Sequence, residues 1–282
     1  MNRGHCGFRL SLRLQSPFPP CASSYGTAES RSITIFNSKH NHAHGGKREN
    51  HQYNECMVDF FKTAAAQSYD EKNLALAPIA GNMHFLIRLI LKDIPQQSRI
   101  LCVGVGTGEE ILSLATEYPE FSFVGVDPSE AMLEVCRERL EKAGIMNRCE
   151  LIHGYVQDVP TDERFDAALS VLVGHFVPRE ERVSLYQNTY ERLSNGGYFI
   201  NTEISFDTAS EDFPLMLKNW EKVQALMGAT AESLTALPRI LTEVLTVLPP
   251  SETEEHIRAG GFTMPIRFFQ SFMIVGWYAR RE

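Results

Sequence analysis

The run "LCVGVGTGEE" from Leu101 to Glu110 constrains the fold of this chain more than any other feature. It places Gly104, Gly106 and Gly108 on alternate positions, directly after an apolar segment and directly before a helix-like one. Such a turn brings backbone N–H groups and a helix N-terminus to the carboxyl edge of a sheet, with no side chains in the way. A ligand can then lie against bare backbone.

Glycines also serve tight strand-to-helix turns for steric reasons, so the run by itself leaves a purely structural alternative open. Asp127 favours binding, because it follows Gly108 by nineteen residues and stands at the expected end of the next strand. A carboxylate there can accept hydrogen bonds from both hydroxyls of a ribose. The two features together predict an adenosyl-ligand site, and the G-x-G-x-G spacing favours a ligand without a pyrophosphate.

From about residue 57 the chain alternates helix-like and strand-like segments, which is typical of helices that cover a largely parallel sheet. The expected strands lie at 99–103, 121–126, 150–155, 166–171 and 198–202, with a turn at 195–197 before the last of them. The expected helices lie at 83–91, 109–118 and 179–193, together with one that Ser129 caps and Gly144 ends.

Composition limits the class of protein. The 282 residues, 43% of them hydrophobic, can bury the core of one large domain. Six cysteines without a CxxC pair predict neither a disulfide framework nor a metal site, which is typical of a reduced, cytoplasmic protein. Residues 1–50 carry a net charge of +5 and the rest of the chain −13. An acidic body repels nucleic acid, and no apolar run approaches the ~20 residues of a membrane span.

Residues 1–55 differ from the rest, being rich in Ser, Asn, His, Arg and Pro without a helical period. We expect a disordered N-terminal extension over 1–55 and a single domain over 56–282. An organellar presequence is a less favoured alternative, because the apolar residues of the segment alternate with period two and form no helical face.

The order of the elements resembles that of the class I S-adenosylmethionine-dependent methyltransferases. The shared features are the glycine loop, the acid that closes the second strand, and "GYVQDVP" and "FDAALSVLV" at the ends of the third and fourth strands. The resemblance covers residues 57–282 and implies an α/β fold with a Rossmann-like seven-stranded sheet flanked by helices. It further implies a helical insert before the last helix, a C-terminal β-hairpin at "PIRFFQSFMIVGWYARR", and S-adenosylmethionine as the cofactor.

The resemblance also implies which residues hold the cofactor. They are Gly104, Val105, Gly106, Gly108, Asp127, Pro128, Tyr155, Val156 and Ser170. Tyr155 stands where the family commonly has an aspartate against the adenine, so a stacking or hydroxyl contact is expected there, with Asp158 serving the turn. Cys102 stands where the family usually has an acid, and a cysteine in a buried strand is expected to be a small core residue.

A narrower resemblance concerns the carboxyl-terminal part. An apolar insert at about 205–248, expected to cap the site or to pack on the sheet edge or on a second subunit, resembles that of the carboxy-S-adenosylmethionine synthases, which modify the cofactor for tRNA wobble-uridine maturation. In that family an arginine holds the carboxylate on the cofactor, and the matching residue here is Arg239. Its guanidinium can equally bind the methionine carboxylate, a carboxylated substrate or Glu243.

Methyl transfer is an in-line displacement, so the protein mainly aligns a nucleophile with the methyl carbon and excludes water. His175 is the first candidate for a general base and His84 the second, with a core histidine as the alternative. Tyr69 can close over the cofactor from the amino-terminal side. The expected function is therefore methyl transfer to a small molecule, in a possible homodimer. The alternatives are a carboxy-S-adenosylmethionine synthase-like enzyme and a non-catalytic protein that binds the cofactor.

Overall fold

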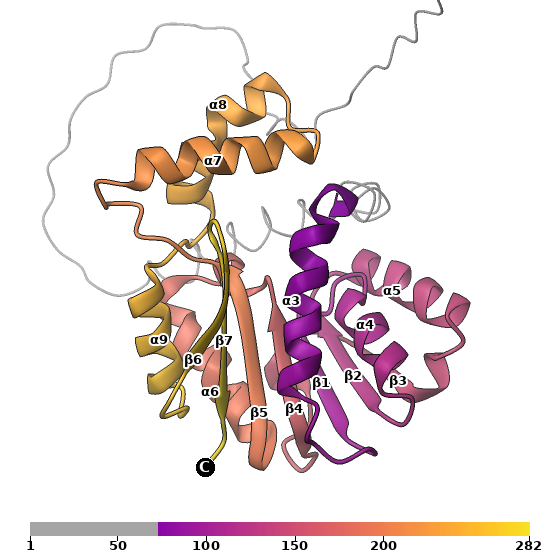
Figure 1. Ribbon diagram of the computed structural model, residues 1–282. Coiled ribbons are helices and arrows are strands. Elements are labelled where there is room, and N and C mark those ends of the chain that lie inside the picture. The colour runs from indigo at the N-terminus through magenta and orange to yellow at the C-terminus, as the bar shows by residue number, and fades with distance from the viewer. Residues whose placement is uncertain (1–72) are drawn as a thin grey trace, which may run out of the picture.

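The computed structural model describes residues 73–282, which form a seven-stranded sheet with helices on both faces (Figure 1). The strand order is β3-β2-β1-β4-β5-β7-β6. The strands are β1 (Arg99–Val103), β2 (Ser122–Asp127), β3 (Cys149–His153), β4 (Phe165–Val171), β5 (Leu193–Ile204), β6 (Ile266–Ser271) and β7 (Ile274–Arg280). The first five run parallel, and β7 is antiparallel to β5 and to β6. The predicted fold class is confirmed, whereas the proposed extension over 1–55 lies outside the described residues.

Two layers of helices cover the sheet. The main helices are α3 (Ala77–Ile90), α4 (Glu109–Glu117), α5 (Glu130–Lys142), α6 (Arg182–Arg192), α7 (Phe213–Leu226), α8 (Ala231–Arg239) and α9 (Pro250–Ala259). Short helical turns are η1 (Leu74–Leu76), η2 (Met146–Arg148), η3 (Val156–Asp158), η4 (Gly174–Phe176), η5 (Arg179–Glu181) and the π-turn η6 (Ile240–Val244). Because strand side chains alternate between faces, Ile100 and Cys102 join one core with α3, α4 and α5, while Leu101 and Val103 join the other with α6 and α9.

The predicted strands and the observed ones agree where the signal is a short apolar run. β1 spans the predicted residues, and the Ser129 side chain caps α5 by accepting from the Met132 N–H at 3.3 Å. β5 differs, because it begins at Leu193, before the predicted turn at 195–197. Gly196 has a φ of +79°, and the pairing of β4 with β5 shifts register nearby. The left-handed glycine thus allows a bulge within the strand pairing in place of a turn before it.

The insert between β5 and α9 forms α7, α8 and η6, which lie beyond the carboxyl ends of the parallel strands in Figure 1. Trp220 and Val223 of α7, with Leu237 and Leu241 after them, belong to the same buried core as Met83 of α3. These four apolar side chains therefore pack within the domain, and the cap over the site stays a prediction.

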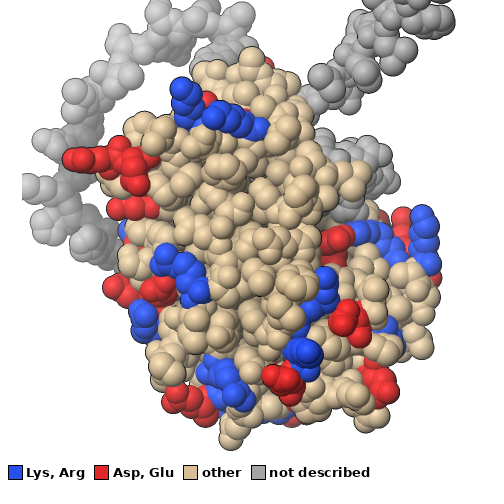
Figure 2. All heavy atoms as spheres, in the orientation of Figure 1, with Lys and Arg blue, Asp and Glu red and all other residues tan. Residues whose placement is uncertain are grey.

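On the face drawn in Figure 2, neither the acidic nor the basic side chains gather into one large patch. Acidic and basic side chains of the described residues are interspersed there around an uncharged centre. Among residues 73–282, no helix combines the length and the apolar character that a membrane crossing needs.

Candidate functional site

The glycine loop connects β1 to α4 with its three glycines in left-handed conformations. Their φ angles are +67° at Gly104, +50° at Gly106 and +80° at Gly108. A Cβ at Gly104 would lie 2.5 Å from Val173 Cγ2, and one at Gly108 would lie 2.6 Å from Cys136 Sγ. A Cβ at Gly106 would meet nothing within 4 Å. Two of the glycines are thus required by close packing, and the middle one faces open space where a ligand can approach.

Asp127 closes β2 beside this loop and is 8% exposed. Its Oδ2 accepts from the Gly106 N–H at 2.9 Å, and its Oδ1 accepts from the Ser129 N–H at 2.8 Å. Burial raises the pKa of Asp127, and these two backbone donors and the nearby His153 oppose the rise. A carboxylate can accept about four hydrogen bonds, so each oxygen keeps a lone pair for a further donor such as a ribose hydroxyl.

A cavity of about 610 Å³ opens at this edge of the sheet. Six of the nine predicted cofactor residues line it, namely Gly104, Gly106, Asp127, Pro128, Tyr155 and Val156. Val105, Gly108 and Ser170 do not: Val105 and Gly108 are buried in the loop, and Ser170 is 1% exposed, paired in register with Asn201 of β5. The volume lies within the range of roughly 300–1,000 Å³ that is typical of small-molecule sites.

The segment after β3 forms the wall at which the family resemblance placed the adenine. Tyr155 is 46% exposed and lines the cavity, while Val156 beside it is buried. The Tyr155 N–H donates to Asp158 Oδ2 at 2.7 Å, so Asp158 serves the turn as the sequence predicted. The aromatic ring is therefore the side chain available for stacking at this wall.

The sequence did not predict the opposite wall, which comes from the segment after β4 and from α6. Leu172 has a φ of +59°, an uncommon conformation for a branched residue, and it lines the cavity. Backbone strain of this kind clusters at functional sites, where the surrounding structure holds it. Here the Leu172 N–H donates to the Thr202 carbonyl at 2.7 Å. No local sequence signal marks this conformation, because it depends on the pairing with β5.

His175 does not line the cavity. It is 3% exposed, and its Nδ1 accepts from the Ile204 N–H at 3.2 Å. Burial, with the nearby Arg182 charge, lowers the pKa of His175 to about 3. The ring is therefore neutral near pH 7 and engaged with β5, which corrects the expectation of a general base and favours the core-histidine alternative.

The other proposed substrate contacts are dispersed. His84 lies buried in α3, where burial lowers its pKa and Glu109 opposes that effect, and Arg239 is exposed in the last turn of α8. Neither lines the cavity. Tyr69 lies outside the described residues. The structure thus gathers the cofactor residues and leaves the proposed catalytic and carboxylate-binding residues apart.

A buried acid that the sequence reading overlooked lies near Cys102. Glu110 is 5% exposed, and its Oε1 has no hydrogen-bond partner among residues 73–282. Burial raises its pKa to about 8, and Asp127 and Glu109 add to the rise. Burial and then the Glu110 charge also raise the pKa of Cys102, so this acid lies close to the position where the family resemblance expected one.

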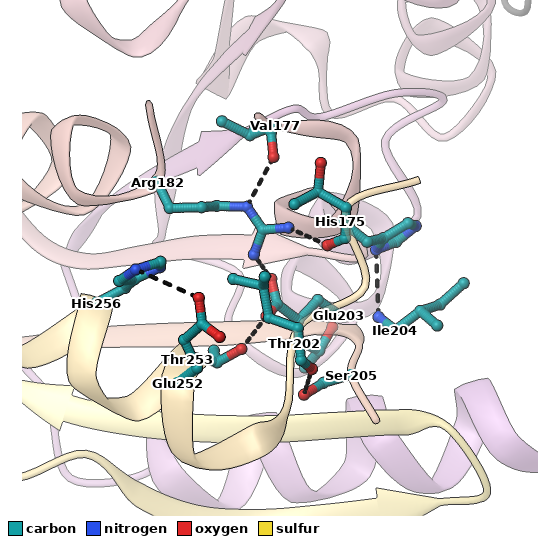
Figure 3. A network of polar contacts seen from close by, with 12 residues as sticks. His175, Val177, Arg182, Thr202, Glu203, Ile204, Ser205, Glu252, Thr253 and His256 are labelled. Carbon is teal, nitrogen blue, oxygen red and sulfur yellow. Dashed lines mark hydrogen bonds and ion pairs between the residues drawn. The ribbon is translucent and has the colours of Figure 1, made fainter. Parts of the chain in front are cut away.

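Behind α6, a second polar cluster joins the cavity wall to the rest of the fold (Figure 3). Arg182 and Glu203 are fully buried and form an ion pair, with Arg182 Nη1 2.8 Å from Glu203 Oε2. Arg182 also donates to the carbonyls of Val177, at 3.0 Å, and Thr246, at 2.7 Å. The Thr253 hydroxyl donates to Glu203 Oε1 at 2.7 Å. The cluster thus ties α6, β5, α9 and the end of the insert to the segment that lines the cavity.

These features define a class of protein. Five parallel strands with glycines after the first, an acid after the second and a cavity at the same edge are the arrangement that binds adenosyl ligands. Comparison with known proteins points to the same class. A methyltransferase domain model matches residues 100–197.

The similar proteins agree with this class. The chain is 24% identical to the carboxy-S-adenosyl-L-methionine synthase of Methylococcus capsulatus over 229 residues, covering 80% of this chain and 95% of that protein. It is 22% identical to the Campylobacter lari protein of the same name, covering 72% and 86%. A putative O-methyltransferase from Nostoc punctiforme has a related structure, with a TM-score of 0.54, 16% identity, and 73% and 58% of the two chains covered. The chain thus has the fold of the class I S-adenosylmethionine-dependent methyltransferases and a methyltransferase domain within it, and S-adenosylmethionine is the cofactor of that class.

The residues of this chain fit that cofactor. The open face at Gly106 admits a ligand against backbone, and the Asp127 carboxylate lies where it can accept from ribose hydroxyls. When bound, S-adenosylmethionine supplies a methyl group on a sulfonium. The residues of the chain bind the nucleoside, exclude water with apolar walls, and orient a second molecule bound in the cavity.

Proposed function

We propose that the protein is a methyltransferase that acts on a small-molecule acceptor. The main support for the proposal is that residues of the glycine loop, Asp127 and the apolar segment after β4 line the same cavity. A nucleophile held there can displace the methyl group in line: the new bond to the methyl carbon forms as the carbon–sulfur bond breaks, and the bonding pair stays on sulfur. An acceptor proton, where there is one, passes to solvent; among residues 73–282, neither proposed histidine lines the cavity.

Binding and turnover test this proposal separately. Calorimetry should give micromolar binding of S-adenosylmethionine and of its demethylated product, roughly −8 kcal/mol of binding free energy. A panel of small hydroxylated and amine acceptors should then yield a methylated product that mass spectrometry detects. A natively folded protein that binds neither nucleoside would overturn the proposal, and binding without turnover of any acceptor would favour the non-catalytic alternative.

A carboxy-S-adenosylmethionine synthase-like activity is the second candidate, because proteins with that name match most of the chain. The additional carboxylate of that cofactor calls for a cation in the site. Among residues 73–282, none of those lining the cavity is Lys or Arg, and Arg239 lies outside it. Mass spectrometry of the ligand that co-purifies with the protein distinguishes the candidates, since only the synthase should carry a carboxylated adduct. A cytoplasmic location and a homodimer remain predictions.

A further inference from the structure

The segment after β4 alternates between the cavity and the protein interior. Residues 171–173 and 176–178 line the cavity, whereas Gly174 and His175 between them are buried and do not line it. The segment begins against the glycine loop, because a Cβ at Gly104 would lie 2.5 Å from Val173 Cγ2. The two buried residues face the interior, so their contacts there set where the lining residues on either side of them lie.

Gly174 lies against the buried ion pair of Arg182 and Glu203. A Cβ at Gly174 would overlap Glu203 Oε2, and it would lie 2.9 Å from Glu203 Cδ and 3.1 Å from Arg182 Nη1. The carboxylate cannot move away, since Arg182 holds Oε2 at 2.8 Å and the Thr253 hydroxyl donates to Oε1 at 2.7 Å. Glycine is therefore required at this position by close approach to a fixed charged group.

The same arginine also fixes the backbone beyond His175. Arg182 donates from Nε to the Val177 carbonyl at 3.0 Å, as Figure 3 shows, and from Nη2 to the Thr246 carbonyl at 2.7 Å. The Thr246 N–H donates in turn to the His175 carbonyl at 2.8 Å. The buried His175 ring lies 4.3 Å from the ring of Phe176, which lines the cavity. Charged donors make the stronger hydrogen bonds, and a satisfied buried network is rigid, so this set of contacts holds the wall in one position.

The nucleoside edge of the cavity depends on a different set of contacts. Asp127 accepts from the Gly106 N–H at 2.9 Å, which joins β2 to the glycine loop. The contacts of Arg182 and Glu203 instead join α6 and β5 to the opposite wall, to the end of the insert and to α9. A change at the ion pair is therefore expected to move the opposite wall and to leave the nucleoside edge in place.

We propose, on the basis of the proposed function, that Arg182 and Glu203 are positioning residues for the acceptor. They touch neither ligand and act through Gly174 and Val177, whose places they fix, on the wall that the acceptor contacts. Methyl transfer needs the nucleophile in line with the methyl carbon, and a misplacement of about 1 Å can lower turnover substantially. The buried pair thus has a role in turnover in addition to its role in the fold.

The test disturbs the contact with the ion pair and measures the two sides of the cavity separately. At saturating S-adenosylmethionine, Gly174→Ala should raise the KM of an acceptor from the panel about ten-fold, while the dissociation constant of S-adenosylhomocysteine changes less than about three-fold. Amide exchange of residues 172–177, followed by mass spectrometry, should become about ten-fold faster. The control is Phe262→Leu, which removes buried volume from the core beneath α6 and should leave the KM and this exchange unchanged.

A shortened carboxylate should compensate for the added methyl group. Glu203→Asp in the Gly174→Ala background makes room for the Cβ, so the KM should return to within about three-fold of the native value. Where Gly174→Ala folds poorly, Thr253→Val is the milder variant, because it removes one donor to Glu203 and keeps the shape of the side chain. It should raise the KM about two- to three-fold.

The KM separates positioning from stability, since loss of folded protein lowers the apparent kcat and leaves the KM unchanged. An unchanged KM or unchanged exchange in Gly174→Ala, an equal rise of the KM in Phe262→Leu, or a double variant without recovery would each overturn the proposal. The exchange measurement needs no acceptor, so it decides the position of the wall even where nothing in the panel is methylated. Absence of methylation counts against the proposed function alone.

Discussion

The cavity edge and the cluster behind α6 both bury a carboxylate, and the two carboxylates have opposite surroundings. Glu203 is 0% exposed and has Arg182 and Thr253 as partners, so its charge is satisfied within the protein. Asp127 is 8% exposed, accepts only from backbone N–H groups in the contacts described above, and faces a cavity. A buried acid with a complete set of partners holds a fold together, and one with spare lone pairs toward open space is available to a ligand.

Breaking the Arg182–Glu203 pair should have the largest effect on stability. Arg182→Ala leaves a buried carboxylate without its cation, which is expected to lower the free energy of unfolding by about 3–5 kcal/mol. The matched control is Arg179→Ala, which removes the ion pair with Glu252 from a guanidinium whose side chain is 62% exposed and should cost less than about 1 kcal/mol. Urea unfolding measures both, and equal losses would contradict the assignment of the buried pair as the structural one.

Removing the charge of Asp127 should affect binding more than stability. In Asp127→Asn one oxygen becomes an N–H donor, so backbone and ribose donors lose an acceptor, at a cost of about 1.5–3 kcal/mol of binding free energy, roughly a ten- to hundred-fold rise in the dissociation constant. Asp166→Asn is the control, because Asp166 Oδ2 likewise accepts a backbone N–H, that of Arg99, at 2.9 Å. Calorimetry with S-adenosylhomocysteine should give near-native affinity for that control, and similar losses in both variants would contradict the role of Asp127.

Glu110 extends the comparison of Glu203 with Asp127, because it is a third buried acid and lacks the Arg and Thr partners of Glu203. With its pKa raised to about 8, the folded protein retains a proton that the unfolded chain has released, so stability falls as the pH rises toward 8. Glu110→Gln should remove this fall, so its stability relative to the native chain should grow by about 2 kcal/mol between pH 6 and pH 8. Thermal unfolding across that range is the measurement, with Glu117→Gln at the exposed end of α4 as control. A difference that does not grow with pH would contradict the buried, protonated state.

His175 should have the smallest effect on activity. Because its ring is neutral and accepts a hydrogen bond from β5, His175→Gln is expected to lower stability by about 1 kcal/mol while the pH dependence of methyl transfer stays unchanged. The pH profile of turnover in the range of an ordinary histidine pKa is the measurement. Loss of an ionisation from that profile would restore His175 as a general base.

The sequence predicted the glycine-loop edge of the cavity but not the region around α6. The glycine loop, the limits of β1 and the Ser129 cap were predicted, because each depends on a few neighbouring residues and on backbone conformation. The wall formed by α6 was missed, although the helix itself was predicted. Which side of α6 meets the ligand is decided by Arg182, whose carbonyl partner on Thr246 lies 64 residues away.

The sequence by itself determined where an adenosyl ligand can meet the sheet, since alternate glycines after a buried strand and an acid after the next leave few other arrangements of the backbone. The tertiary structure alone decided the ionisation of the buried groups. The neutral ring of His175 and the proton on Glu110 follow from burial and from charges distant in the chain, which local sequence does not encode.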